Sequence, residues 1–373
     1  MRVTVSAGAL PWCLALALAA PAAAEPVTPR DTATDALERA AFIALPAVYN
    51  VTGDLRVAAI VTDGRRIRID RTVPIRGTAF GVAPDRVVTA LHLVRPPTAL
   101  VLADLAALGV HGLPTDPSTT RVIAKPVTRV ALTRAQAAGS AFTCAGEVPT
   151  TITATVGRPA TNPEDDLVLL TITAPNAPTL TLNDDQHAQT SVAAIGFGDQ
   201  SSAIPAIRTG TIIGPARIDA NDAFATVEID VLRGDSGAPV IDERGQARGV
   251  VLRRETDETK PVMAQAKSVR RLLTADGVTN LESAETTGFR TAMAAFWDRD
   301  YALAERRLTA VTQTYTDAAL ARCEARQAHA LAAARYEISG PSRTRAAILA
   351  LGAMATLAAA LLGIVRVRRH PLD

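Results

Sequence analysis

The sequence RGDSGAPV, residues 233–240, is the strongest structural signal in this 373-residue chain. A serine nucleophile needs a tight turn that exposes its hydroxyl group and directs nearby backbone N–H groups to one point, where they stabilise an oxyanion. Gly234 and Gly237 permit such a turn because glycine has no Cβ atom. Alone, Gly-Asp-Ser-Gly could be a surface turn. Between two runs typical of β-strands the motif is more specific, and Ser236 becomes a candidate nucleophile.

His92 is the candidate base for this serine, because a hydroxyl near neutral pH is a weak nucleophile and needs activation. The chain has five histidines. His111 and His187 fall in polar loops, His329 in an expected helical segment and His370 near the C-terminal end. Only His92 ends an expected strand, in the sequence GTAFGVAPDRVVTALH. The alternative interpretation of His92 is a structural histidine that closes this strand.

A buried carboxylate is expected beside the base, where it holds the tautomer and stabilises the imidazolium. The sequence EDDLVLL offers Asp165 and Asp166 in front of an apolar run. We favour Asp166 because it directly adjoins the expected strand. Asp165 remains the alternative.

These motifs resemble the chymotrypsin/trypsin superfamily, because TALH, DDLVLL and GDSGAP occur in the order His, Asp, Ser. The sequences ALPAVYNVTG and GTAFGV look closer to its bacterial branch, which includes the high-temperature-requirement proteases. The resemblance covers residues 46–273 and implies two six-stranded β-barrels with the catalytic triad between them. It implies His92 as general base and acid, Asp166 as its orienting partner and Ser236 as nucleophile. The backbone N–H groups of Gly234 and Ser236 would form the oxyanion hole.

The chain departs from this family's pattern at several points. Ala238 stands where a second glycine is usual, and Leu91 where alanine is common before the histidine. The segment between the histidine and the aspartate is longer than in the compact digestive enzymes. No Arg-Ile-Val-Gly-Gly activation site occurs, so we do not expect activation by a new N-terminus buried against Asp235. We also expect no PDZ-like domain after the barrels.

Asp230 is a candidate specificity residue. In the trypsin branch, the residue six positions before the nucleophile lies at the base of the pocket for the side chain that precedes the cut bond. Here that residue is Asp230. A carboxylate in this place would attract Arg or Lys and disfavour apolar side chains. The alternative is that Asp230 faces solvent and that cleavage follows small or apolar residues.

The chain between residues 46 and 273 has the pattern of an all-β barrel or sandwich, with short runs of Val, Ile and Thr between Gly, Pro and Asp. Residues 286–337 are instead expected to be helical. The sequence WDRDYALAERRL resembles part of a tetratricopeptide repeat, but that fold normally needs three or more units. A plain helical stalk or hairpin is therefore favoured, with a protein partner as a further hypothesis. The expected strands are Val57–Thr62, Ile67–Ile69, Arg86–Ala90, Thr150–Val156, Leu167–Thr173, Val192–Gly196, Ala225–Ile229 and Gly249–Leu252.

The two ends of the chain have the composition of targeting and membrane segments. Residues 1–24 resemble a signal peptide, with a short apolar run before small residues, and residues 25–45 a loose leader. Residues 346–365 contain no charge and would span about 30 Å as a transmembrane helix, the thickness of a hydrocarbon core. Arginines are denser after this stretch, so we expect residues 366–373 in the cytoplasm and the catalytic domain outside it.

The composition limits the partners and the cofactors. A net charge of +2 gives no reason to expect nucleic acid as a partner, and no pattern suggests a metal or another cofactor. Nearly all basic residues are arginine and alanine is abundant, which is typical of a bacterial protein from a GC-rich genome. A disulfide between Cys144 and Cys323 is one alternative, but we favour two separate thiols, because the two residues lie in different expected regions.

The sequence therefore predicts a membrane-tethered serine endopeptidase that cleaves extracytoplasmic proteins or peptides. A catalytically silent binding module built on the same barrels is the competing hypothesis. The three expected triad residues and the glycines of the nucleophile turn are all present, which favours activity. A chaperone-like activity has no sequence feature of its own.

Overall fold

A computed structural model describes most of the chain between the two expected targeting segments. The described residues are 36–136, 150–162, 165–173, 177–185, 187–198, 204–218, 221–252, 261–315 and 318–339.

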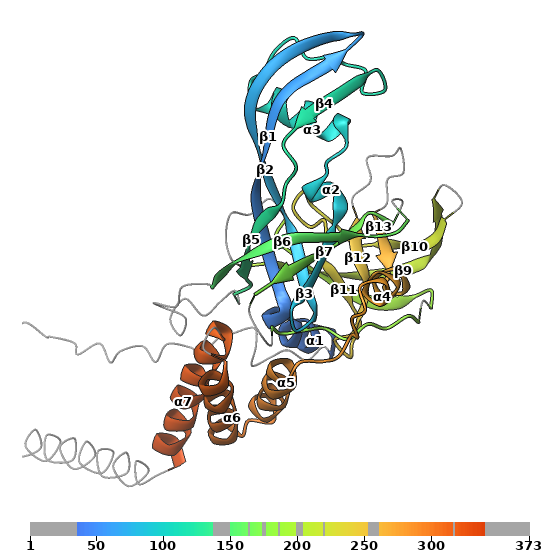
Figure 1. Cartoon of the computed structure of the whole chain (residues 1–373). Coiled ribbons are helices and arrows are strands. Elements are labelled where there is room, and N and C mark those ends of the chain that lie inside the picture. Colours follow the sequence, from blue (N-terminus) through green and yellow to red (C-terminus); the bar gives the residue numbers. More distant parts are fainter. Residues whose placement is uncertain are drawn as a thin grey trace, which may run out of the picture.

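The first half of the chain forms a closed barrel of six antiparallel strands (Figure 1). Strand β1 closes the barrel, because it pairs with β2 on one side and with β5 on the other. A seventh strand, β4, pairs with the outer part of β1. Tyr49, Val87, Leu132, Val168 and Leu170 are among the side chains that fill the interior. The strands are β1 (Val48–Thr62), β2 (Arg65–Ala83), β3 (Arg86–Ala90), β4 (Thr120–Ala124), β5 (Arg129–Arg134), β6 (Thr151–Pro159) and β7 (Leu167–Ile172).

The second half forms another closed barrel of six strands, in the order β10-β13-β12-β11-β8-β9. Its interior is apolar and includes Val192, Ile212, Val240, Val251 and Met263. The expected architecture of two six-stranded barrels is therefore confirmed. The strands are β8 (Thr190–Gly196), β9 (Ala206–Ile218), β10 (Asn221–Glu228), β11 (Pro239–Ile241), β12 (Ala247–Leu252) and β13 (Val262–Gln265).

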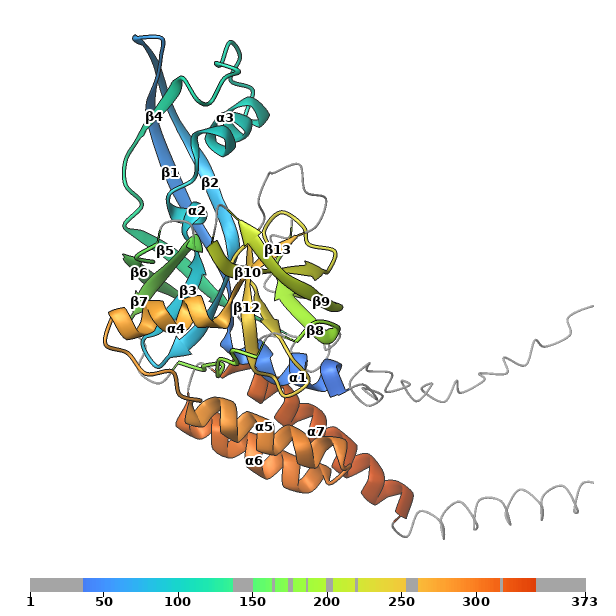
Figure 2. The same cartoon turned by 90° about the vertical axis from the view of Figure 1, so that its right-hand side faces the viewer.

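Helices surround the barrels at three places. The short α2 and α3 follow β3, whereas α1 and a 3-10 turn precede β1, and α4 to α7 follow β13. Helices α5, α6 and α7 pack side by side below the barrels in both views (Figures 1 and 2). The helices are α1 (Ala36–Ala44), the 3-10 turn (Leu45–Ala47), α2 (Leu91–Val94), α3 (Thr98–Ala107), α4 (Ala266–Ala275), α5 (Ala284–Trp297), α6 (Tyr301–Thr314) and α7 (Ala319–Ser339).

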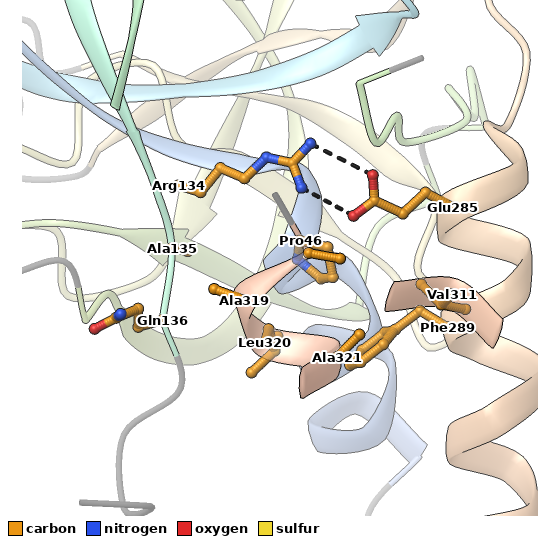
Figure 3. A pocket seen from close by; sticks show the side chains of 11 residues that line it. Pro46, Arg134, Ala135, Gln136, Glu285, Phe289, Val311, Ala319, Leu320 and Ala321 are labelled. Atoms are coloured by element: carbon orange, nitrogen blue, oxygen red, sulfur yellow. Dashed lines mark hydrogen bonds and ion pairs between the residues drawn. The ribbon is translucent and has the colours of Figure 1, made fainter. Parts of the chain in front are cut away.

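The helices after the barrels are fixed to them through buried contacts, which a free stalk would lack. The Arg134 guanidinium on β5 donates to the Glu285 carboxylate on α5 over 2.9 Å, with side chains only 8% and 2% exposed (Figure 3). Ser283 caps α5 and also accepts a hydrogen bond from the Thr179 N–H group. Removing one partner of such a buried pair leaves an uncompensated charge, so the pair fixes the position of α5.

Strands β1 and β2 continue well beyond the first barrel as a long hairpin (Figures 1 and 2). The β1–β2 register extends from Val48↔Phe80 at the barrel to Thr62↔Arg65 at the tip. Helix α3 lies against this extension, and its Val101 and Leu105 are buried there in the main core. The long segment expected between His92 and Asp166 thus contains α3 and β4.

Several expectations concern residues outside the described part of the chain. The expected signal peptide, residues 1–24, and the expected transmembrane segment, residues 346–365, both lie there. Among the described residues, no helix is both long and apolar enough to cross a membrane. Cys323 on α7 is disulfide-bonded, so the expectation that it is a separate thiol is wrong. Cys144 lies outside the described residues.

Candidate active site

Ser236 lies in a tight turn that only glycine-rich sequence can form. Gly234 has a φ angle of +100° and Gly237 of +89°, conformations that other residues rarely adopt. The Asp235 N–H group donates to the Leu232 carbonyl over 3.1 Å and closes the turn. A Cβ atom on Gly237 would lie 2.0 Å from the Thr78 carbonyl oxygen, so the turn also fits closely against the first barrel.

Thr78 on β2 connects this turn to the first barrel. Its N–H group donates to the Ser236 carbonyl over 2.9 Å, and its hydroxyl donates to the Gly234 carbonyl over 2.8 Å. The same hydroxyl accepts a hydrogen bond from the Phe197 N–H group over 3.1 Å. Both carbonyls of the turn are thereby turned towards β2. Within the described part of the chain, the N–H groups of Gly234 and Ser236 donate no hydrogen bond, which leaves them free for an oxyanion.

His92 and Asp166 form a close pair at the end of the first barrel. His92 Nδ1 lies 2.6 Å from Asp166 Oδ2, and the His92 N–H group donates to Asp166 Oδ1 over 2.9 Å. The Leu91 N–H group donates to the Asp166 carbonyl over 2.8 Å. Because β3 and β7 are paired up to Ala90↔Leu167, the residues that follow β3 and precede β7 must meet. Asp166 takes a positive φ of +50° to make these contacts.

Asp165 points away from this pair. Its side chain is 4% exposed, and its Oδ2 atom lies 3.2 Å from a guanidinium nitrogen of Arg271 on α4. The two neighbouring aspartates therefore have different partners: Asp166 contacts His92, and Asp165 contacts α4. Of the two candidates, only Asp166 contacts His92 among the described residues.

His92, Gly234 and Ser236 line one groove, with a volume of about 710 Å³, between the two barrels and α3. The first barrel brings the histidine and the aspartate, and the second brings the serine. Among the described residues, no hydrogen bond joins His92 to Ser236. In structures without substrate, such a contact is often long and tightens only when substrate binds.

Residues 77–250 match the family model of the trypsin-like peptidase domain. The chain contains a trypsin-like serine peptidase domain. The match begins within β2, ends within β12 and includes every residue of the candidate triad. A comparison with curated proteins found no match.

Among solved structures, the peptidase resembles the Rv3671c protease from M. tuberculosis in its active form, with 20% identity and a TM-score of 0.41. That similarity covers 65% of this chain and 87% of the other. The inactive form of the same protease has 19% identity and a TM-score of 0.40, covering 65% and 95%. A variant of the HtrA-type protease AlgW with a decapeptide has 15% identity and a TM-score of 0.44, covering 65% and 67%. These sequence identities and TM-scores are low, so the assignment to the trypsin-like peptidases rests on the match of residues 77–250 alone.

The side chain of Asp235 in the peptidase is almost fully buried and has a cationic partner that the sequence analysis missed. Two nitrogen–oxygen contacts of 3.1 and 2.9 Å join the Arg208 guanidinium on β9 to the Asp235 carboxylate, which is 1% exposed. The same carboxylate accepts hydrogen bonds from the N–H groups of Gly198 and Leu232, over 2.8 and 2.7 Å. Arg208 thus supplies a positive charge to the residue directly before Ser236, the candidate nucleophile.

We expect Arg208→Gln to impair both the fold and the catalytic turn of the peptidase. Removing one partner of a buried ion pair costs about 3–5 kcal/mol, because the other charge stays buried without compensation. The Gly234 and Ser236 donors would lose their fixed direction, and the loss of one such donor costs about a hundredfold in rate. Thermal unfolding and peptide hydrolysis measure the two effects.

Two variants control this experiment. Arg129→Gln removes an exposed arginine of β5 and should change neither quantity. The double variant Arg208→Gln/Asp235→Asn should recover part of the lost stability, because it also removes the buried charge. Wild-type activity in Arg208→Gln would show that the ion pair does not position the turn.

An ion pair at the start of β3, the strand that precedes His92, helps to fix the position of this histidine. Arg86 at the start of β3 donates to Asp276, directly after α4, over 2.9 Å. This hydrogen bond raises the pKa of Arg86 above its ordinary value. Because β3 leads into His92, the contact with α4 helps to fix the strand that carries the candidate base.

The structure does not bring Asp230 into the groove. Its side chain is exposed, and it is absent from the described residues that line the groove with His92 and Ser236. Asp230 therefore lies on the surface, which was the alternative interpretation of this residue. Ala238, the substitution noted beside the turn, is fully buried and donates its N–H group to the Asp235 carbonyl over 2.8 Å.

Proposed function

We propose that the peptidase is an endopeptidase that cleaves extracytoplasmic proteins through an acyl-enzyme on Ser236. The observation that carries this proposal is the 2.6 Å contact between His92 Nδ1 and Asp166 Oδ2 in the groove that also contains Ser236. An imidazole held by a carboxylate through Nδ1 has its Nε2 atom available as a base.

The proposed reaction follows from the position of each group. His92 Nε2 takes the proton of the Ser236 hydroxyl while the serine oxygen attacks the carbonyl carbon of the substrate. The carbonyl oxygen becomes negatively charged and accepts hydrogen bonds from the N–H groups of Gly234 and Ser236. His92 then gives its proton to the leaving amine, and the carbon–nitrogen bond breaks to leave an ester on Ser236. Water, deprotonated by His92, hydrolyses this ester and restores the serine.

Asp166 stabilises the positive charge that His92 carries during both steps. The side chains of His92 and Asp166 are only 13% and 19% exposed, so water screens their attraction little. The hydrogen bond from the His92 backbone to the other carboxylate oxygen keeps Asp166 in this orientation.

A fluorophosphonate probe tests the proposed chemistry, because it reacts with activated serine hydroxyl groups. We expect covalent labelling of the wild-type chain at Ser236, seen by mass spectrometry of the modified peptide, and no labelling of Ser236→Ala. A folded wild-type protein that stays unlabelled would favour the competing hypothesis of a catalytically silent binding module.

We propose that the catalytic domain lies outside the cytoplasm, held at the bilayer by residues 346–365 after removal of residues 1–24. The sequence patterns described above support this arrangement. Protease added to spheroplasts should digest the barrels, whereas a tag after Asp373 should resist until detergent is added. A cytoplasmic marker protein controls for leakage. Barrels that resist digestion in intact spheroplasts would contradict the proposed orientation.

A further inference from the structure

The β1–β2 hairpin carries more positive than negative charge. Residues 54–76 contain three acidic residues and six basic ones. All six basic side chains are exposed, and none forms an ion pair with any other described residue. An unpaired cluster of this kind can bind an acidic partner. The six are Arg56, Arg65, Arg66, Arg68, Arg71 and Arg76.

The groove that contains Ser236 extends along this hairpin. Five consecutive residues of β2, from Val73 to Gly77, line it, and so do residues of α3 on the opposite side. Because side chains of a strand alternate between its two faces, consecutive lining residues mean that the groove follows the edge of β2. The groove therefore leads from the nucleophile outwards along the strand edge.

The edge of β2 in this groove has no strand partner. Over residues 73–78, β2 pairs with β1 on one side, and its pairing with β3 on the other side begins only at Ala79. Thr78 donates its N–H group away from β1, to Ser236, so the backbone groups of Arg76 point to the same free edge. Pro74 lacks an N–H group, which a free edge tolerates. An extended chain can pair with such an edge.

The charges inside the groove leave one arginine without a partner. Three residues other than His92 carry charge among those that line the groove: Arg76, Asp104 and Arg233. Asp104 on α3 is ion-paired with Arg233, the residue before Gly234. Arg76 consequently gives the groove a net positive charge close to the scissile bond.

We propose that this groove binds the part of the substrate that follows the scissile bond, and that it selects acidic residues there. The inference rests on the proposed function. The leaving amine takes its proton from His92, which belongs to the first barrel, so the chain after the cut bond lies on the side of β2. The side chain of Arg76 meets about the second or third residue after the cut.

Arg71, on the same strand just beyond the residues that line the groove, extends this selectivity further from the cut. It lies five residues from Arg76 on the same strand, and at about 3.3 Å per residue the separation is roughly 17 Å. An extended substrate has the same rise, so Arg71 meets about the seventh or eighth residue after the cut. The substrate class is thus a protein with two acidic clusters downstream of the cleaved bond.

An anionic membrane is the competing partner for basic residues, and the arrangement of the fold disfavours it. The hairpin tip and helices α5 to α7 lie at opposite ends of the molecule (Figures 1 and 2). The proposed membrane anchor follows α7, which places the hairpin on the side away from the bilayer.

Cleavage of matched peptides by the full chain tests the proposal. The peptides are identical up to the cut bond and differ only after it. Counted from the cut, the near pair is residues two and three and the far pair is residues seven and eight. Each peptide carries glutamate in the near pair, in the far pair, in both pairs or in neither, with glutamine at the remaining positions. We expect kcat/KM to be about tenfold higher with four glutamates than with four glutamines at low salt. Each exposed ion pair contributes up to about fivefold to kcat/KM. Arg76→Gln should therefore reduce the advantage of glutamate in the near pair, and Arg71→Gln should reduce the advantage of glutamate in the far pair.

Arg66→Gln, next to the hairpin tip and ten residues from Arg76, is the matched control and should keep both advantages. Equal kcat/KM values for glutamate and glutamine peptides would overturn the proposal. So would an advantage that Arg66→Gln abolishes as strongly as Arg76→Gln, or binding of the hairpin to phosphatidylglycerol vesicles without any peptide preference.

A binding measurement separates this proposal from the proposed function. Fluorescence anisotropy with the Ser236→Ala chain reports peptide affinity without hydrolysis. Tighter binding of the glutamate peptide, weakened in Arg76→Gln, would support the groove even if the wild-type chain cleaved no peptide. Equal affinities in this assay would overturn the groove proposal while leaving the catalytic proposal intact.

Discussion

Replacement of Ser236 by alanine is expected to abolish peptide hydrolysis, with a loss of about 10⁶-fold in kcat. The variant removes the oxygen that forms the acyl bond and leaves the backbone donors of Gly234 and Ser236 in place. His92→Ala should cause almost the same loss, because the groups of a triad act as one unit. Turnover of a quenched peptide substrate measures both.

The fold should survive this change. The Thr78 N–H group donates to the backbone carbonyl of Ser236 and not to its hydroxyl group. Alanine at this position therefore keeps that hydrogen bond. Circular dichroism and thermal unfolding should therefore match the wild type. Near-normal turnover in a folded Ser236→Ala protein would refute the acyl-enzyme mechanism.

Asp166→Asn is expected to reduce kcat by about 10⁴-fold, because an amide at this place favours the wrong tautomer of the histidine. The Nδ1 atom of His92 would accept a hydrogen bond from the amide, and Nε2 would then carry the proton instead of accepting one from Ser236. Turnover of the quenched peptide substrate at neutral pH measures this loss.

Asp165→Asn is the matched control, because the two aspartates are neighbours in the chain and differ in their partners. Asp165 contacts Arg271 on α4, so its substitution should lower the unfolding temperature and change kcat little. If Asp165→Asn were the more damaging variant for catalysis, the assignment of the triad would move by one residue.

The local sequence predicted the parts of the molecule that depend on neighbouring residues. The run Arg86–Ala90 has the bounds of β3, and the eight expected runs all fall within or largely overlap strands of the structure. Strands with weaker patterns were missed: β5 contains the exposed Arg129 and the half-buried Thr133, and β11 has only three residues. For these strands, pairing within the barrel decides the conformation more than composition does.

Contacts between distant residues could not be predicted in this way. Arg208 is one of many arginines, and nothing near it in the sequence indicates that it meets Asp235. A signal did exist: a buried aspartate before the nucleophile, without an N-terminus to neutralise it, requires a cation from elsewhere in the chain. The position of α5 against β5 likewise depends on Arg134 and Glu285, which are far apart in the sequence.

The division of the catalytic groups between two barrels has a consequence for the newly made protein. The first barrel, with His92 and Asp166, leaves the ribosome before the second. Until the second barrel has folded and its turn has met Thr78, the base has no serine to activate. The catalytic site is therefore complete only after two finished barrels have docked, and a partly synthesised chain does not yet have it.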